Sequence, residues 1–352
     1  MTEDQARFDV PTWWQQTAFL EFKNLYVTKK KNPLFFVGSG LSIGAGLPNW
    51  RTLLLTLAQM HDEGAPGVKP IHADVAARVN QSARDQTHYL QAGMEIETAF
   101  ARDIPGESFR KAINSILNDE TRLPKSSPTH DTIATLRWSR IITTNYDVLL
   151  ERAAKAISFY EVLTTHPDKE TFWEAEPADF DRRSILKIHG DIADNASRLV
   201  LSESSFQQRY YGQDQDKYVT VLRTVLRSSP VTLFLGYGHA DPYIRTLFSQ
   251  VLSKAVAKQN VFALIPREGD PSLFAKHLQE LAQQDIRVIT YSPDDEHQEL
   301  LEFLQYFTAP DSHDARYERR QRRRRPTVVM LHCGGTIGSA AAHDDLEAHD
   351  QL

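Results

Sequence analysis

The chain has 352 residues, of which 24% are charged, and its formal net charge at pH 7 is −6. This charge argues against a global binding surface for nucleic acid or another polyanion. The absence of any run of about 18 apolar residues argues against a membrane span. The start of the chain, Met1–Gln5, is acidic and lacks the basic and then apolar pattern of a secretory signal, so we expect a cytoplasmic protein.

Residues 1–31 predict an amphipathic helical segment rich in aromatic residues. We expect Trp13 and Trp14 to pack against the core or against a neighbouring subunit. The next apolar run, Leu34–Val37, is short and aromatic-rich, as is typical of a buried parallel strand.

A glycine-rich turn follows this strand at residues 38–51 and leads into a helix-forming stretch that starts near Thr52. Glycine permits a positive φ and a close approach to a ligand, and N–H groups near a helix start attract anionic oxygens. The strand, turn and helix therefore predict a phosphate cradle. Short glycine turns without a ligand are about as common, so Gly38-x-Gly40 alone is a weak signal.

From about residue 60 to 128 the pattern predicts helices and loops without a strand, and Ser127-Pro128 opens a helix that ends near Trp138. Later helices are predicted at 146–157, in two stretches before Ser228, and after the following strands. The strands predicted after residue 128 are Arg140–Thr143, Ile185–Ile188, Arg198–Leu201, Val231–Leu235, Val261–Ile265 and Arg287–Thr290.

This alternation predicts an α/β fold with a Rossmann-like, doubly wound parallel sheet and a helical insertion at about 60–128. Ligands of such sheets bind beyond the carboxyl ends of the strands. Several segments directly follow predicted strands and should therefore meet in one cleft. These segments are Gly38–Ser42, Asn145, His189 and Gly236–His239.

The glycine turn resembles the sirtuin pattern G-A-G-x-S-x-x-x-G-[IL]-P-D-F-R, with Ser39, Asn49 and Trp50 in place of Ala, Asp and Phe. The positions that keep the pattern are Gly38, Gly40, Ser42, Gly46, Pro48 and Arg51. Further along, Ile141–Asp147 resembles the strand end T-Q-N-[IV]-D, and Ile185–Asp191 resembles the strand that ends in the H-G dipeptide.

Leu233–Pro242 is similar to the later strand and turn of the SIR2-like bacterial branch of this family. Together the four motifs cover roughly residues 30 to 308 in the expected order. The resemblance implies a SIR2-like domain over 1–310 that binds NAD+.

The resemblance also implies roles for single residues. Asn145 would bind the ribose hydroxyls and the attacking water, His189 would act as general base, and Asp147 would shape the nicotinamide pocket or brace Asn145. The N–H groups near Gly38–Gly40 and the Ser42 hydroxyl would hold the pyrophosphate, and Arg51 would contact phosphate or ribose. The implied NAD-binding positions are Gly38, Ser39, Gly40, Ser42, Pro48, Arg51, Thr144, Gly236, Tyr237, Gly238 and His239.

Structural roles remain open for some of these residues. Asn145 and Asp147 are of the types that cap a following helix. A structural role for His239 is at least as well founded as a binding role, and Asp241-Pro242 is typical of a helix cap with proline in the first turn.

Cys333 is the single cysteine, which suits a reducing compartment and excludes the four-cysteine zinc ribbon of deacetylase sirtuins. We therefore expect no metal.

The resemblance implies NAD+ as a substrate. The leading interpretation is an NAD+ glycohydrolase that releases nicotinamide and ADP-ribose. The resemblance implies a defence effector that depletes NAD+ during phage infection, forms homo-oligomers, and responds to an activating protein or nucleotide signal. The alternatives are an NAD-dependent protein deacylase or ADP-ribosyltransferase, and a non-catalytic sensor of NAD+ or an ADP-ribose derivative.

The last part of the sequence differs in composition. Residues 311–326 contain the basic run Arg319–Arg325, which is more typical of a solvated linker than of a nucleic-acid contact. Residues 327–352 follow, and the stretch around Thr336 is similar to the opening T-G-G-T-I motif of L-asparaginases, whose threonine is the nucleophile. We interpret this stretch as a fragment of a second domain or as a disordered tail.

Overall fold

The computed structural model describes residues 12–80, 87–104, 109–119, 127–157, 162–173, 183–211, 215–237, 260–267, 270–293 and 297–309. The chain divides into two compact units, Met1–Thr308 and Ala309–Leu352. Only the first unit is described below. The predictions for Gly238, His239 and Asp241-Pro242, for the basic run Arg319–Arg325 and for the stretch from residue 327 lie outside the described residues.

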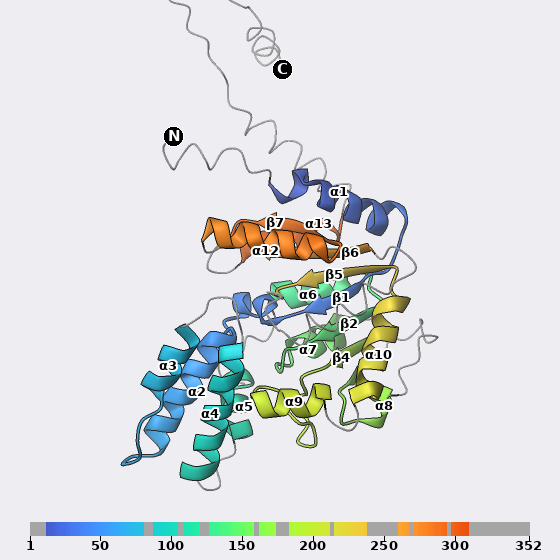
Figure 1. Ribbon diagram of the computed structural model, residues 1–352. Coiled ribbons are helices and arrows are strands. Elements are labelled where there is room, and N and C mark those ends of the chain that lie inside the picture. Colours follow the sequence, from blue (N-terminus) through green and yellow to red (C-terminus); the bar gives the residue numbers. More distant parts are fainter. Residues whose placement is uncertain are drawn as a thin grey trace, which may run out of the picture. The chain divides into compact units, whose positions relative to one another are not determined.

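The core of the first unit is a seven-stranded sheet in which all neighbouring strands are parallel (Figure 1). Its strand order is β3-β4-β2-β1-β5-β6-β7, so the direction of winding reverses at β1. A crevice opens at such a switch point. The strands are β1 Leu34–Val37, β2 Arg140–Thr143, β3 Val162–Thr165, β4 Arg183–Lys187, β5 Val231–Leu235, β6 Asn260–Pro266 and β7 Ile286–Tyr291.

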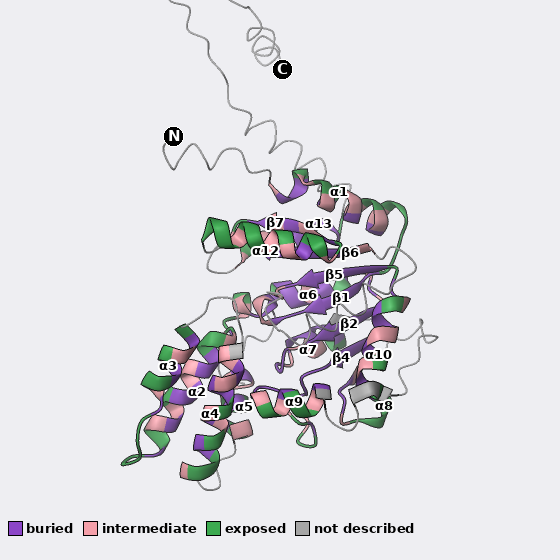
Figure 2. Ribbon diagram, viewed as in Figure 1, coloured by how far each residue is buried: buried purple, intermediate pink, exposed green. Residues whose placement is uncertain are grey.

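Helices cover both faces of this sheet, which confirms the predicted doubly wound α/β fold. The buried strands lie between helices that are partly exposed (Figure 2). The helices are α1 Thr17–Lys23, α2 Trp50–Gly64, α3 His72–Asn80, α4 Thr87–Asp103, α5 Phe109–Leu117, α6 Pro128–Thr135, α7 Leu149–Ile157, α8 Glu170–Trp173, α9 Glu203–Tyr211, α10 Gln215–Ser228, α12 Pro271–Gln283 and α13 Gln298–Tyr306.

Alternate residues of the strands pack toward opposite layers, as the pleat of a strand requires. On one face, Phe36 and Phe234 share a core cluster with Leu222 of α10 and Leu281 of α12. On the other face, Phe262 of β6 contacts the aromatic residues that the N-terminal segment contributes. The central strands are therefore buried on both sides.

An aromatic cluster closes this second face, and its members are Trp13, Phe19, Phe22, Phe303, Tyr306 and Phe307. The ring of Trp13 lies edge-on to Phe19 at a centroid distance of 5.1 Å, and Phe22 lies edge-on to Phe262 at 5.4 Å. Trp13 is fully buried, and Trp14 is 6% exposed. The structure thus confirms that these tryptophans pack against the core.

Helices α2, α3, α4 and α5 form a group of their own, which Figure 1 shows beside the sheet and away from α10 and α12. They share a separate apolar cluster that includes Leu54, Val75, Ile96 and Ile113. The helix α2 starts where the glycine turn ends, with the Asn49 side chain accepting from the backbone N–H of Thr52 at 2.9 Å. This group therefore lies next to the carboxyl end of β1.

One predicted strand is wrong and one strand was missed. Arg198–Leu201 is extended but joins no ladder, because the N–H of Val200 donates to the His189 carbonyl and that of Leu201 to Ser205 Oγ. The strand β3, Val162–Thr165, instead pairs with β4 and is only partly buried. Its weak apolar pattern explains why the sequence did not predict it.

Two helix ends also differ from the prediction. The helix α6 ends at Thr135 rather than near Trp138, and α7 begins at Leu149 rather than at Tyr146. The later start of α7 leaves residues 144–148 as a loop after β2, which is where the candidate site lies.

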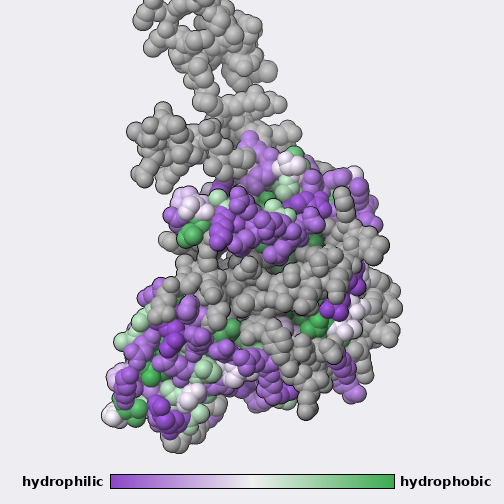
Figure 3. All heavy atoms as spheres, viewed as in Figure 1, coloured by the Kyte–Doolittle hydropathy of each residue, from purple (hydrophilic) through white to green (hydrophobic). Residues whose placement is uncertain are grey.

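The described surface is mainly polar in the view of Figure 3. Its large exposed apolar side chains are Leu20, Val68, Met94, Leu163 and Leu273, which belong to different elements and loops. Across the described ranges, no helix has the length and apolar character needed to cross a bilayer. Within the same ranges, no three His, Cys, Asp or Glu side chains gather as a metal site would require.

Candidate functional site

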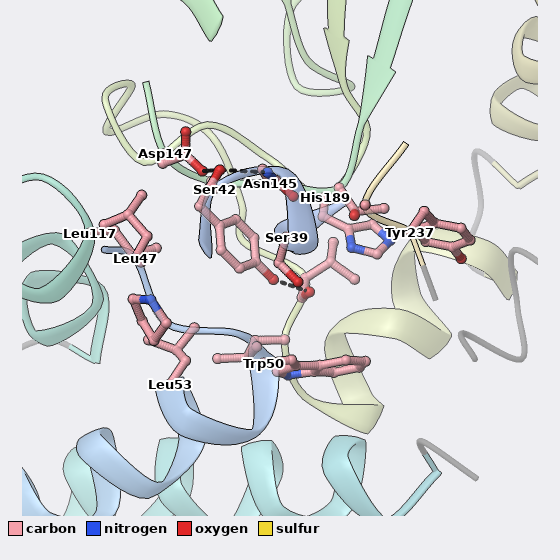
Figure 4. Close-up of a pocket in the computed structure, with 16 residues that line it drawn as sticks. Ser39, Ser42, Leu47, Trp50, Leu53, Leu117, Asn145, Asp147, His189 and Tyr237 are labelled. Carbon is pink, nitrogen blue, oxygen red and sulfur yellow. Dashed lines mark hydrogen bonds between the residues drawn. The ribbon is translucent and has the colours of Figure 1, made fainter. Parts of the chain in front are cut away.

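A pocket of about 110 Å³ lies where β1, β2, β4 and β5 end (Figure 4). It brings together most of the residues that the sequence predicted for the site. Those residues are Ser39, Ser42, Pro48, Thr144, Asn145, Asp147, His189, Gly236 and Tyr237. The remaining lining residues, which the sequence did not single out as ligands, are Leu47, Trp50, Leu53, Leu117, Tyr146, Val200 and Leu201.

The register of the sheet places Asn145 beside His189. Thr143 at the end of β2 pairs with Lys187 at the end of β4 in a parallel ladder. Asn145 and His189 each follow their paired residue by two positions, so both emerge at the same edge of the sheet. Both are buried, with exposed fractions of 7% and 5%.

The amide of Asn145 has a fixed orientation. Its Nδ2 donates to the Gly38 carbonyl and to Ser42 Oγ, each at 3.2 Å, and its backbone N–H donates to Thr143 Oγ1 at 3.0 Å. The Oδ1 atom is buried and has no hydrogen-bond partner among the described residues. A buried acceptor without a partner costs about 1–3 kcal/mol, so this oxygen is suited to a ligand that donates a hydrogen bond.

A chain of hydrogen bonds behind the pocket sets this orientation. Ser42 Oγ donates to Asp147 Oδ2 at 2.9 Å, because a carboxylate only accepts. Ser42 Oγ therefore accepts from Asn145, and from His130 Nε2 at 3.3 Å. His130 Nδ1 then accepts from Ser127 Oγ at 2.8 Å. Burial lowers the pKa of His130, which favours the neutral ring that this arrangement requires.

His130 had no signal in the sequence. It lies in the first turn of α6, far along the chain from Ser42, and only the tertiary packing brings the two together. The sequence left three roles open for Asp147, which were to shape the nicotinamide pocket, to brace Asn145 or to cap the next helix. Its Oδ1 accepts from the N–H of Leu149 at 3.1 Å, and its Oδ2 accepts from Ser42, which in turn accepts from Asn145.

His189 is held among aromatic rings. Its Nε2 lies 3.0 Å from the Tyr210 hydroxyl, and the Phe206 ring lies edge-on at a centroid distance of 4.9 Å. Burial lowers the pKa of His189 to about 3, and the nearby charge of Arg209 adds to this effect. The imidazole is therefore neutral at physiological pH, with one ring nitrogen as a hydrogen-bond donor and the other as an acceptor.

Trp50 takes the place of the phenylalanine in the sirtuin pattern and extends this aromatic wall. It stacks on Phe206 at a centroid distance of 6.2 Å and an interplanar angle of 18°. Figure 4 shows Trp50 on the opposite side of the pocket from Asn145 and Asp147. The pocket thus has a polar wall at the strand ends and an apolar wall from α2, α5 and the segment after His189.

The glycine turn does not offer its N–H groups in the way the sequence predicted. The N–H of Gly38 donates to the Leu235 carbonyl at 3.0 Å, and that of Gly40 donates to the Gly236 carbonyl at 2.9 Å. A Cβ on Gly38 would lie 2.6 Å from the Gly236 oxygen. In this structure these two N–H groups therefore join the segment after β1 to the end of β5, and the role of the N–H groups near Gly38–Gly40 in binding pyrophosphate stays a prediction.

Arg51 also differs from the expectation. Its side chain is exposed and donates to Asn80 Oδ1 on α3 at 2.6 Å, and it is not among the pocket residues. It is the second residue of α2, and its neighbours Trp50 and Leu53 line the pocket instead. The contact between Arg51 and phosphate or ribose stays a prediction.

Comparisons with known proteins agree with this fold. The family model of the SIR2-like domain matches residues 139–289, which include β2, β4 and β5. The matched region contains both Asn145 and His189. This part of the chain is therefore similar to a SIR2-like domain, and it supplies the strands β2, β4 and β5 at whose ends the pocket lies.

Three relatives are similar to this chain. It is 26% identical over 224 residues to Defense-associated sirtuin 2 of Bacillus subtilis, across 62% of this chain and 19% of that protein. It is 24% identical over 235 residues to NAD(+) hydrolase ThsA of Enterococcus faecium, across 63% of this chain and 40% of that protein. It is 26% identical over 226 residues to NAD(+) hydrolase ThsA of Bacillus cereus (strain MSX-D12), across 64% and 40% respectively. The matched region therefore covers less than half the length of each relative.

Proposed function

We propose that this chain is an NAD+ glycohydrolase that cleaves the bond between nicotinamide and ribose. One observation supports the proposal: Asn145 presents to the pocket a buried oxygen that has no partner among the described residues, and a neutral His189 lines the same pocket. Two relatives named NAD(+) hydrolase support the same activity.

The chemistry suits these two residues. The positive pyridinium already weakens the N-glycosidic bond, so the site mainly has to orient the ribose and place a nucleophile. Asn145 Oδ1 would accept a hydrogen bond from a ribose hydroxyl or from the attacking water. Water then forms a bond to the anomeric carbon, and nicotinamide leaves with the electron pair of the broken bond. His189 takes the proton, which requires its pKa to rise from about 3 when the substrate is bound.

The size of the pocket bears on activation. Ligand pockets commonly measure about 300–1,000 Å³, whereas this one measures about 110 Å³. Leu53 of α2 and Leu117 of α5 line it and restrict its volume. A whole dinucleotide would extend beyond this space, toward the neighbouring hollow that shares Leu47 and Pro48. We expect an activating protein or nucleotide signal to act on α2 and α5, which border both spaces.

The biological role follows from the same proposal. One relative is named a defence-associated sirtuin, which supports a role in anti-phage defence through depletion of NAD+. Such a role requires access to the cytoplasmic NAD+ pool, and we expect a homo-oligomer that switches on when triggered.

The decisive test measures nicotinamide release from NAD+ by the full chain and by His189→Ala and Asn145→Ala. Asn80→Ala serves as the matched control, because Asn80 is exposed and outside the pocket. Release by the parent and the control, but not by the two site variants, would support the proposal. Equal release by all four proteins would exclude this site. Binding of NAD+ without release by the parent would favour a sensor, and turnover of an acyl-lysine peptide would favour a deacylase.

A further inference from the structure

A buried lysine lies directly beneath the candidate site. Lys187 is the last residue of β4, two positions before His189, and its side chain has no exposed surface. Its Nζ lies close to four oxygen atoms. These are the Asp147 carbonyl at 2.6 Å, Glu151 Oε1 at 2.7 Å, the Tyr146 carbonyl at 3.1 Å and Asp191 Oδ1 at 3.2 Å.

These oxygens belong to the segments that carry the site residues. The carbonyls of Tyr146 and Asp147 follow Asn145 in the loop after β2, and Asp191 follows His189 in the loop after β4. One ammonium group therefore joins the loop of Asn145 to the loop of His189.

The charges around this group keep it protonated. Burial alone would lower the pKa of Lys187, but the carboxylates of Glu151 and Asp191 hold it above its ordinary value. Burial in turn raises the pKa of Glu151, against the effect of Lys187. The ammonium thus retains its three N–H donors, donates to the Tyr146 and Asp147 carbonyls, and lies within ion-pair distance of Glu151 and Asp191.

Stability alone gives no reason for this arrangement. Replacing a buried ion pair by apolar residues of similar volume is often neutral or stabilising, because the charges lose their hydration. What apolar residues cannot replace is the direction of the bonds to two backbone carbonyls. The lysine is therefore better explained by where it holds the loops than by the energy of its ion pairs.

We propose that Lys187 is a positioning residue that sets Asn145 and His189 at the separation needed for catalysis. This inference rests on the function proposed above. A displacement of about 1 Å in a reacting group can lower a rate by about a hundredfold. Loss of the ammonium should therefore lower kcat much more than it changes KM.

The test compares Lys187→Met with the parent chain in NAD+ hydrolysis. We expect kcat to fall about a hundredfold and KM to stay within about threefold, because Asn145 and His189, once displaced, stabilise the transition state less. Lys187→Arg should recover part of kcat, since it keeps the charge and the donors. Lys69→Met is the matched control, because Lys69 forms an exposed ion pair with Asp74 at 2.9 Å, and it should hydrolyse NAD+ like the parent. A Lys187→Met variant with the parental kcat would overturn the proposal.

A second variant covers the case in which Lys187→Met does not fold. The double variant Lys187→Met/Glu151→Leu removes both charges and should fold, yet it should remain about a hundredfold slower than the parent. Parental activity in this folded double variant would overturn the proposal.

A readout without NAD+ separates this proposal from the function on which it rests. Loss of the ammonium should shift or broaden the imidazole NMR signals of His189, which are assigned by their absence in His189→Ala. Unchanged His189 signals in the Lys187 variants would overturn the positioning role, even if the parent releases no nicotinamide. If the His189 signals change in the Lys187 variants but the parent never cleaves NAD+, the result would instead contradict the proposed function.

Discussion

The aromatic cluster beside β6 and the polar pocket at the ends of β2 and β4 are both buried, but different forces hold them. The rings from Trp13 to Phe307 are stabilised by the area that they remove from water and by edge-to-face contacts. The pocket is held by hydrogen bonds with assigned donors and acceptors, such as those of Asn145 and Ser42.

This difference between apolar contacts and directed hydrogen bonds predicts different effects of substitution in the two regions. Apolar contacts have little directional preference, so a core tolerates substitutions that conserve its volume. Hydrogen bonds in a buried network fail when one partner is removed, because the remaining groups lose both water and partner. Substitutions in the aromatic cluster should therefore change the free energy of unfolding, whereas substitutions around the pocket should change activity.

The largest expected effect is on stability. Trp13→Ala should lower the free energy of unfolding by about 3–5 kcal/mol, because it removes a fully buried ring. Urea unfolding of the full chain measures this loss, with Trp13→Phe as the more conservative control. The kcat of the folded fraction should stay at the parental value. A fall in kcat without a loss of stability would contradict the view that the aromatic cluster serves stability alone.

The pocket should in turn make stability depend on pH. The pKa of His189 is about 3 in the folded chain and near 6.5 when unfolded, so the unfolded chain binds the extra proton between these values. Stability should therefore fall as the pH is lowered from about 6.5 toward 3, by about 1.4 kcal/mol per pH unit for this one proton. Urea unfolding at several pH values measures the slope. The slope should be smaller in His189→Gln, and an equal slope in both proteins would contradict the buried neutral imidazole.

A smaller effect is expected behind the pocket. His130→Leu should lower kcat/KM about tenfold, because Ser42 loses a donor that is worth about 1–1.5 kcal/mol. His130→Gln keeps a side-chain N–H and should recover most of this loss. The rate of nicotinamide release is compared between the two variants. Equal rates would show that the His130 ring contributes volume rather than a hydrogen bond.

The smallest effect is expected at Arg51, which lies outside the pocket. Arg51→Ala should change the free energy of unfolding by less than about 0.5 kcal/mol, as expected for an exposed side chain, and should leave nicotinamide release within about twofold of the parent. A much larger loss of activity would mean that Arg51 leaves Asn80 and reaches the bound nucleotide.

The fold was predictable because local patterns and tertiary structure agree along most of the chain. Leu34–Val37, Arg140–Thr143 and Val231–Leu235 are strands with the predicted ends. Buried parallel strands form short apolar runs that end where polar residues begin. The edge strand β3 lacks this signal because one side of it is partly exposed.

The site was predictable in part, for a related reason. Asn145 and His189 follow strands directly, so the rule for parallel sheets places them at one edge. His130 and Lys187 could not be assigned because their roles depend on partners from other elements, which the chain order does not reveal. The hydrogen bonds from the N–H groups of Gly38 and Gly40 to the carbonyls of Leu235 and Gly236 likewise join segments that lie far apart in the sequence.

The contacts between the two glycine turns also define which positions can accept mutations. A Cβ on Gly236 would lie 2.2 Å from the backbone N of Leu41, so every other residue is excluded there on steric grounds. Gly46 also has a positive φ of 80°, but nothing lies within 4 Å of its would-be Cβ. A library of random variants selected for folding should therefore keep only glycine at 236, while asparagine or aspartate should recur at 46.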